Sequence, residues 1–213
     1  MCSIIGSFSP GKFKQLVALN QSRGQFSFSF MLLNPHTCSV ISLHQDFGTF
    51  QIDLIDKVPK GVYLLGHTQA PTNGLIRDKN RIHPATCNLA FLFHNGIIKQ
   101  KDIKRLQSVL KTSEEWDSQL MLYDMIQTGL VESLNTVDGS FSCVYSDSKQ
   151  LRLFRSAAGV LFVDDDLNIS STYFEGSTRL KKDVVFIVDF IKQKLVEEIT
   201  FKSMSNPYFL AGA

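Results

Sequence analysis

The second residue of the chain is a cysteine, a residue type that can act as a nucleophile. Cys2 follows Met1, and cysteine is small enough for the initiator methionine to be removed before it. A chain that begins at Cys2 carries a free α-amine, whose reference pKa of about 7.7–8.0 suits a base near neutral pH. The amine can take the thiol proton directly or through a water, so the nucleophile carries its own base. The alternative is a terminal cysteine that is merely buried.

A second pair of residues is suited to stabilising the charge that such a nucleophile creates. Attack by a thiolate on an amide places negative charge on the carbonyl oxygen, and that charge needs hydrogen-bond donors already in position. Asn95 offers a side-chain amide and Gly96 a backbone N–H, directly after an apolar run typical of a strand. The two donors predict an oxyanion hole. The alternative is a plain Asn-Gly turn that joins two strands.

These residues belong to a series of short motifs whose order resembles that of one enzyme family. The motifs are Cys2-Ser3-Ile4-Ile5-Gly6, Ser22-Arg23-Gly24, the loop 66–74, His94-Asn95-Gly96-Ile97-Ile98, Trp116-Asp117-Ser118-Gln119, and the segments 137–141 and 155–161. Together they resemble the class II glutamine amidotransferases, such as glucosamine-6-phosphate synthase and asparagine synthetase, from residue 2 to about residue 190. The resemblance implies that Cys2 releases ammonia from glutamine through a thioester, with Asn95 and Gly96 as the oxyanion hole.

The resemblance also implies how the α-amino and α-carboxylate groups of L-glutamine are bound. Asp117 is the expected acceptor for the ammonium, although its carboxylate would also stabilise the first turn of a helix. Thr72 and backbone groups of its loop are expected to hold the carboxylate. Arg23, grouped with these substrate-binding residues, is expected to brace the surroundings of Cys2 rather than to touch substrate. An ordinary surface arginine is the alternative.

Gln69, also grouped with the substrate-binding residues, departs from the family pattern. The family has an arginine at this position for the substrate carboxylate, whereas a neutral amide supplies no charge and no planar fork. Arg77 or Arg81 in the following loop could replace that arginine. Otherwise glutamine binds weakly or the natural substrate differs. His67, two residues earlier, is interpreted as a structural strand-end residue rather than a triad member, because the α-amine already supplies the base.

Strands and helices must position these residues. Phenylalanine and serine alternate over 25–30, the pattern of a half-buried strand, and further strands are expected at 39–43, 61–66, 89–93, 141–145, 151–154, 160–163 and 184–188. Helices are expected from Lys12 to near Gly24, around 103–110, and from a cap at Thr112 or Ser113 to Leu130. This order predicts an α+β fold with helices outside the sheets. The family resemblance implies a four-layer αββα N-terminal-nucleophile hydrolase sandwich of two mainly antiparallel sheets.

The composition of the chain argues against several classes of function. The 213 residues fit a single domain, with a core of about 2–190 and a short tail. With 22 basic against 20 acidic side chains, the net charge of +2 predicts no nucleic-acid face and no electrostatic membrane anchor. The four cysteines form no CxxC pair, so no metal and no cofactor is expected. No apolar run approaches the ~18 residues of a membrane span, and no signal peptide is recognised, so a cytoplasmic protein is expected.

A partner is also expected. The residues after about 190 are too few for a synthase domain, so the ammonia is expected to pass to a separate synthase or ligase subunit in trans. Two other functions stay open. One is hydrolysis of another amide or γ-glutamyl substrate by the same thiol, which the Gln69 departure favours. The other is a catalytically retired scaffolding subunit, against which the intact Cys2, Asn95-Gly96 and Asp117 set argues.

Overall fold

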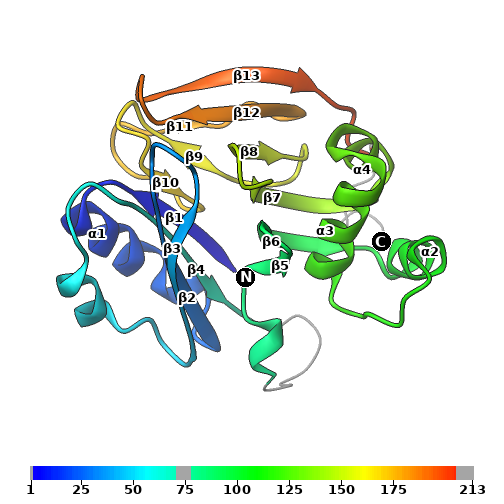
Figure 1. Cartoon of the computed structure of the whole chain (residues 1–213), viewed down its shortest axis with the longest axis horizontal. Coiled ribbons are helices and arrows are strands. Elements are labelled where there is room, and N and C mark those ends of the chain that lie inside the picture. The colour runs from blue at the N-terminus through cyan, green and yellow to red at the C-terminus, as the bar shows by residue number, and fades with distance from the viewer. Residues whose placement is uncertain (1, 71–77, 205–213) are drawn as a thin grey trace.

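Two antiparallel sheets lie face to face in the middle of the molecule, as the computed structural model shows (Figure 1). The structure describes residues 2–70 and 78–204. In spatial order, the first sheet contains β11 (Thr178–Arg179), β9 (Phe162–Val163), β10 (Ile169–Ser170), β1 (Ser3–Ser7), β4 (Tyr63–Gln69), β2 (Ser27–Leu33) and β3 (Val40–Phe47). The second contains β13 (Lys194–Thr200), β12 (Val184–Asp189), β8 (Leu151–Arg155), β7 (Gly139–Ser146), β6 (Ala90–Ile98) and β5 (Ala85–Cys87).

Helices cover the outer face of each sheet. On the first sheet lies α1 (Pro10–Asn20), followed directly by the 3₁₀ turn η1 (Gln21–Arg23). On the second lie α2 (Gln100–Leu110), α3 (Asp117–Thr128) and α4 (Leu130–Thr136). Two further 3₁₀ turns are η2 (Ile52–Lys57) and η3 (Lys79–Arg81). The predicted αββα sandwich of antiparallel sheets is therefore confirmed. Over residues 2–70 and 78–204, none of the helices has the length and apolar character needed to cross a lipid bilayer.

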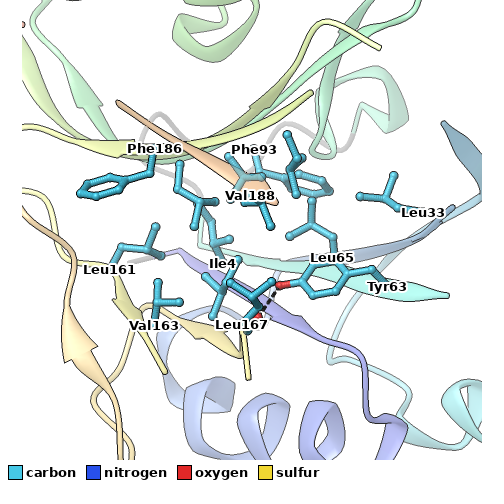
Figure 2. Close-up of a cluster of buried hydrophobic side chains, with 14 of the residues drawn as sticks. Ile4, Leu33, Tyr63, Leu65, Phe93, Leu161, Val163, Leu167, Phe186 and Val188 are labelled. Carbon is cyan, nitrogen blue, oxygen red and sulfur yellow. Dashed lines mark hydrogen bonds between the residues drawn. The ribbon is translucent and has the colours of Figure 1, made fainter. Parts of the chain in front are cut away.

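Three buried apolar clusters fill the spaces between the layers, and the alternation of strand side chains assigns residues to them. Successive side chains in a strand point to opposite faces of the sheet. In β1, Ile4 enters the cluster between the two sheets, which Figure 2 shows, while Ile5 enters the cluster beneath α1. In β6, Phe93 faces the first sheet, whereas Leu92 faces the helices on the outside. Both strands are thus covered on both faces.

The strand expected at 25–30 exists, but it is buried on both faces rather than one. β2 is buried from Ser27 to Leu33. Phe28 and Phe30 pack in the cluster beneath α1, and the alternating positions face the second sheet. The serines at those positions are therefore inside the sandwich. Ser27 donates its hydroxyl to Gln69 Oε1 at 2.9 Å. An alternation of apolar and polar residues therefore did not mark an exposed face.

The third expected helix begins later than its sequence pattern indicated. α3 begins at Asp117, and residues 112–116 before it form an irregular segment in which a Glu114 carboxylate oxygen accepts the N–H groups of Glu115 and Trp116 at 2.8 Å. Thr112 accepts the N–H of Glu114 instead of capping a helix. Gly129, with φ of 99°, separates α3 from α4, because that backbone conformation favours glycine. The expected helix therefore corresponds to α3, and α4 was not predicted.

The folded core extends past residue 190, which was its expected end. β13 pairs with β12 along its length, and Phe201 after it is buried. The Phe201 ring stacks on Phe141 with centroids 6.2 Å apart, and it meets the Phe154 ring edge-on at 6.4 Å. These contacts close the cluster between the second sheet and its helices. The expected core boundary was therefore too early.

Candidate active site

Cys2 lies immediately before β1, which is an inner strand of the first sheet. β1 pairs with β4 on one side and with β10 on the other. Alternation places the Cys2 side chain on the same face as Ile4, toward the second sheet. The thiol is buried, and its Sγ donates to the Ala70 carbonyl at 3.5 Å. Arg23, at the end of η1, donates its Nε to the Cys2 carbonyl at 3.1 Å. The guanidinium therefore holds the backbone of the candidate nucleophile.

The surroundings of Cys2 favour the neutral thiol. Burial raises the pKa of the Cys2 thiol, and the charge of Asp117 raises it further, while the charge of Arg23 lowers it. The thiol therefore needs a base before it can attack. His67 does not supply one here: its Nε2 contacts the His94 carbonyl at 3.2 Å, and burial lowers its pKa to about 3. This geometry agrees with the structural role expected for His67.

Asn95 and Gly96 lie inside a strand rather than in a turn. Both belong to β6, where Asn95 is opposite Ser142 and Gly96 opposite Phe141 in β7. The alternative of a plain Asn-Gly turn is therefore wrong. Alternation turns the Asn95 side chain toward the first sheet, together with that of Phe93. There the Asn95 Nδ2 donates to the hydroxyl of Ser171 at 3.1 Å.

The N–H of Gly96 points away from β7. Phe141 uses both of its backbone groups on Ser156, donating its N–H to Oγ at 3.0 Å and accepting the Ser156 N–H at 2.9 Å. Gly96 and Phe141 are therefore a non-hydrogen-bonded pair, and the Gly96 N–H is directed to the opposite edge of β6. β5 covers that edge only from Ala90 to Leu92. The edge beside Gly96 is thus left open by β5.

Gly96 also has no room for a side chain. A Cβ there would overlap the Ser140 carbonyl and would lie 2.7 Å from His94 Nε2. β7 and the His94 ring approach the backbone too closely for any other residue. The sequence predicted Gly96 as a site residue only because of its backbone N–H. The structure adds a second reason for glycine, which is the lack of space for a Cβ.

Asp117 lies along the same open edge of β6. It is the first residue of α3, and its Oδ2 accepts the N–H of Ile98 at 3.4 Å. Ile98 is two residues after Gly96, so the two N–H groups point to the same side of the strand. Asp117 Oδ1 accepts the N–H of Ser118 at 2.8 Å, and the Asp117 side chain remains 19% exposed. The carboxylate thus lies beside the open edge and retains access to solvent.

Three buried histidines form a network behind these residues, and this network was not predicted from the sequence. The Ser118 hydroxyl contacts both His83 Nε2 and His94 Nδ1 at 3.0 Å. The rings of His67 and His83 lie against each other with centroids 4.0 Å apart. Burial lowers the pKa of all three imidazoles, so they are neutral at pH 7. The network joins β4, β6 and α3. The sequence contained one indication of this network, because His94 directly precedes Asn95 and Ser118 directly follows Asp117.

Gln69 and Arg81 are occupied by contacts within the protein. Gln69 accepts from the Ser27 hydroxyl and donates its Nε2 to the Arg81 carbonyl at 3.3 Å. The Arg81 guanidinium lies 3.7 Å from a carboxylate oxygen of Glu114 and 3.9 Å from one of Glu115. Thr72 and Arg77 lie outside the described residues. Within residues 2–70 and 78–204, no group of three His, Cys, Asp or Glu side chains is arranged to hold a metal ion.

Two solved structures have a similar fold. A glutamine phosphoribosylpyrophosphate amidotransferase from B. subtilis, complexed with ADP and GMP, matches with a TM-score of 0.65 and 15% identity, over 92% of this chain and 49% of that chain. The structure of the allosteric regulatory enzyme of purine biosynthesis matches with a TM-score of 0.67 and 14% identity, over 97% and 50%. This chain therefore spans about half the length of each.

Comparison of the sequence with known families and proteins identifies no relative. No family model matches the sequence, and no curated protein matches it. At the identities of the two structural matches, the likeness establishes the fold alone. That fold is a layered α+β sandwich of two antiparallel sheets with helices outside them.

Proposed function

We propose that this chain is a class II glutamine amidotransferase that uses Cys2 to release ammonia from L-glutamine. The observation that carries the proposal is the way Ser171 links the two sheets at this site. Its hydroxyl accepts both the N–H of Ile4, two residues after Cys2, and the Nδ2 of Asn95. One hydroxyl thus links the strand that follows the candidate nucleophile to the candidate oxyanion donor, although they belong to different sheets. Asp117 lies close enough for its charge to act on the Cys2 thiol.

The proposed reaction proceeds in two halves. The α-amine of a chain that begins at Cys2 takes the thiol proton, and the thiolate attacks the side-chain carbonyl carbon of glutamine. Asn95 Nδ2 and the Gly96 N–H hold the negative oxygen that results. The ammonium then returns its proton to the amide nitrogen, the C–N bond breaks, and ammonia leaves a γ-glutamyl thioester. Water, deprotonated by the same amine, attacks the thioester and releases glutamate and the thiol.

We further propose distinct recognition roles for the residues around Cys2. Asp117 accepts the α-ammonium of glutamine, because its carboxylate lies on the open edge of β6 and remains partly exposed. Arg23 holds the Cys2 backbone rather than substrate. Thr72 and its loop bind the α-carboxylate. Gln69 holds the Arg81 backbone instead of touching substrate, because its carboxamide is already engaged at both ends.

The ammonia is proposed to pass to a separate synthase or ligase subunit. The fold neighbour named for phosphoribosylpyrophosphate amidotransfer has about twice the length of this chain, so the part that matches this chain is only half of that enzyme. The proposed compartment is the cytoplasm. Cys2, Cys38, Cys87 and Cys143 are all free thiols, which fits a reducing environment.

Hydrolysis of another amide is the second candidate. Its support is the engagement of Gln69 and Arg81 with other residues, which leaves neither group free to bind a substrate carboxylate in this arrangement. A γ-glutamyl compound whose carboxylate is bound differently would suit the same thiol. Ammonia release from glutamine, compared with product release from γ-glutamyl amides, separates the two candidates.

The decisive experiment combines turnover with labelling of the nucleophile. Purified protein, shown by intact mass to begin at Cys2, should release ammonia from glutamine, and diazo-oxo-norleucine should label Cys2. Cys2→Ala should abolish both. Cys87→Ala is the matched control, because Cys87 is the more exposed thiol and non-specific alkylation would choose it first. Full activity in Cys2→Ala, or in protein that retains Met1, would overturn the proposal.

A further inference from the structure

Ser171 is a buried residue at the junction of the two sheets, and its side chain has two partners. It follows β10 directly, and its backbone N–H donates to the Ile4 carbonyl at 3.0 Å, so it extends the pairing of β10 with β1. Its hydroxyl accepts the Ile4 N–H at 2.9 Å and the Asn95 Nδ2 at 3.1 Å. The residue is 1% exposed, so water does not compete for these bonds. One oxygen therefore connects β1 to β6.

Such a connection matters because most side chains between the two sheets do not fix the position of one sheet against the other. The contact of His67 Nε2 with the His94 carbonyl at 3.2 Å is also directional, but it joins β4 rather than β1 to β6. Within each sheet, the ladder of backbone hydrogen bonds fixes neighbouring strands. Between the sheets lie apolar side chains such as those in Figure 2, whose contacts are non-directional. The nucleophile belongs to the first sheet and the oxyanion donors to the second. A directional bond across the interface fixes the distance on which their cooperation depends.

The same bond orients the Asn95 carboxamide. The terminal torsion of an asparagine is broad, so an unrestrained amide would sample many orientations. An oxyanion donor works only when it is already aimed at the place where charge develops. By engaging Nδ2, Ser171 restricts the plane of the amide while that nitrogen keeps a second hydrogen for the oxyanion.

We propose that Ser171 is a positioning residue of the reaction, which acts through Asn95 by fixing the orientation of its carboxamide and its distance from the Cys2 strand. This inference rests on the proposed function. Ser171 touches no reacting atom, so its removal should slow the chemical step without changing the binding of glutamine.

The preceding residue provides a matched control. Ser170 is also fully buried, and its hydroxyl also accepts two hydrogen bonds, from Asn20 Nδ2 at 2.8 Å and from the Thr172 N–H at 3.0 Å. Because it points to the opposite face of the strand, it has no contact with Asn95. Replacing either serine by alanine therefore removes the acceptor of one buried and one partly buried hydrogen bond, but only one of the two replacements disturbs the oxyanion donor.

The test measures kcat, KM and the melting temperature for Ser171→Ala and Ser170→Ala, with glutamine and with a neutral activated ester. Both variants should melt at similarly lower temperatures. Ser171→Ala should lower kcat at least about tenfold, a part of the roughly 10²–10³-fold effect of a whole oxyanion donor, with KM near that of the wild type. Ser170→Ala should keep kcat within about twofold. In an Asn95→Ala background, Ser171→Ala should cause no further loss, because the two residues act through one group.

Ser171→Cys carries the same test if the alanine variant fails to fold, since it retains the size of the side chain but accepts hydrogen bonds weakly. Wild-type kcat in these variants, equal losses in the Ser170 variant, or full additivity with Asn95→Ala would each overturn the inference. Wild-type protein that is inert toward glutamine but hydrolyses the ester would refute the proposed function alone, and the ester would then report on Ser171. Protein inert toward both substrates would overturn both.

Discussion

Replacing Gln69 by arginine should weaken the fold while it strengthens binding of glutamine. The change removes the acceptor of the Ser27 hydroxyl and the donor to the Arg81 carbonyl. Each hydrogen bond contributes about 0.5–1.5 kcal/mol, so the free energy of unfolding should fall by about 1–3 kcal/mol. For a chain of this size, about 1 kcal/mol corresponds to roughly 2–4 °C, so the melting temperature should fall by roughly 2–12 °C.

Glutamine should bind more tightly to the Gln69→Arg variant because the new guanidinium can make a charged contact with the substrate carboxylate. A hydrogen bond to a charged group is worth about 1.5–3 kcal/mol, which corresponds to a KM for glutamine lower by roughly 10- to 150-fold. The carboxylate carries the same charge in the ground state and in the transition state, so kcat should stay near its wild-type value. Initial rates of glutamate formation over a range of glutamine concentrations measure both parameters.

Gln69→Met separates the two effects. Methionine has a similar size, forms neither hydrogen bond and carries no charge, so it should lower the melting temperature as arginine does and leave KM unchanged. If Gln69→Arg lowers KM no more than Gln69→Met does, the reasoning is refuted and the carboxylate is bound elsewhere. Arg77→Ala and Arg81→Ala would then show whether either arginine binds it, and normal KM values in both would favour a different amide substrate.

Three further outcomes are expected. The lowered pKa values of the buried histidines, to about 3 for His67, mean that the unfolded chain binds more protons below about pH 6.5, so the stability they contribute is complete above that pH and is lost toward pH 3. Denaturation midpoints that do not change between pH 7.5 and 5 would contradict this. Asn95→Ala should lower kcat by roughly 10²–10³-fold and Asp117→Asn should mainly raise KM, so equal effects on one parameter would reverse these roles. Gly96→Ala should cost about 1–3 kcal/mol or more in urea denaturation, because its Cβ would overlap the Ser140 carbonyl, and a normal midpoint would disprove that contact.

Apolar runs were sufficient to locate most of the longer strands, but not the exposed edge strand β13 or several of the shortest strands. β7 and β12 are buried and rich in β-branched and aromatic residues, and both were predicted. β13 was missed because its exposed position allows lysine and glutamate to interrupt the pattern. β10 and β11 contain two residues each, too few for any periodicity. These elements depend on pairing with distant strands rather than on their own sequence.

The candidate site likewise contains residues that could be predicted from the sequence and one that could not. Cys2 and Asn95-Gly96 were found because their chemistry is local: a thiol beside an α-amine, and two donors in adjacent residues. Ser171 was not found, because its contacts join residues 76 and 167 positions apart. Nothing local distinguishes it from Ser170, and only the register of β10 against β1 decides which hydroxyl faces Asn95.

The place of β1 between β4 and β10 determines when the site can form during synthesis. β1 is synthesised early, yet it acquires one of its two neighbours only after residue 170 has been made. Contacts at such separation carry a high loop-closure cost and are slow to form. We therefore expect the amino terminus to remain accessible to a methionine aminopeptidase until β10 has been made. Cleavage of Met1 and burial of Cys2 are then successive events, and the thiol becomes enclosed only after β10 has been made.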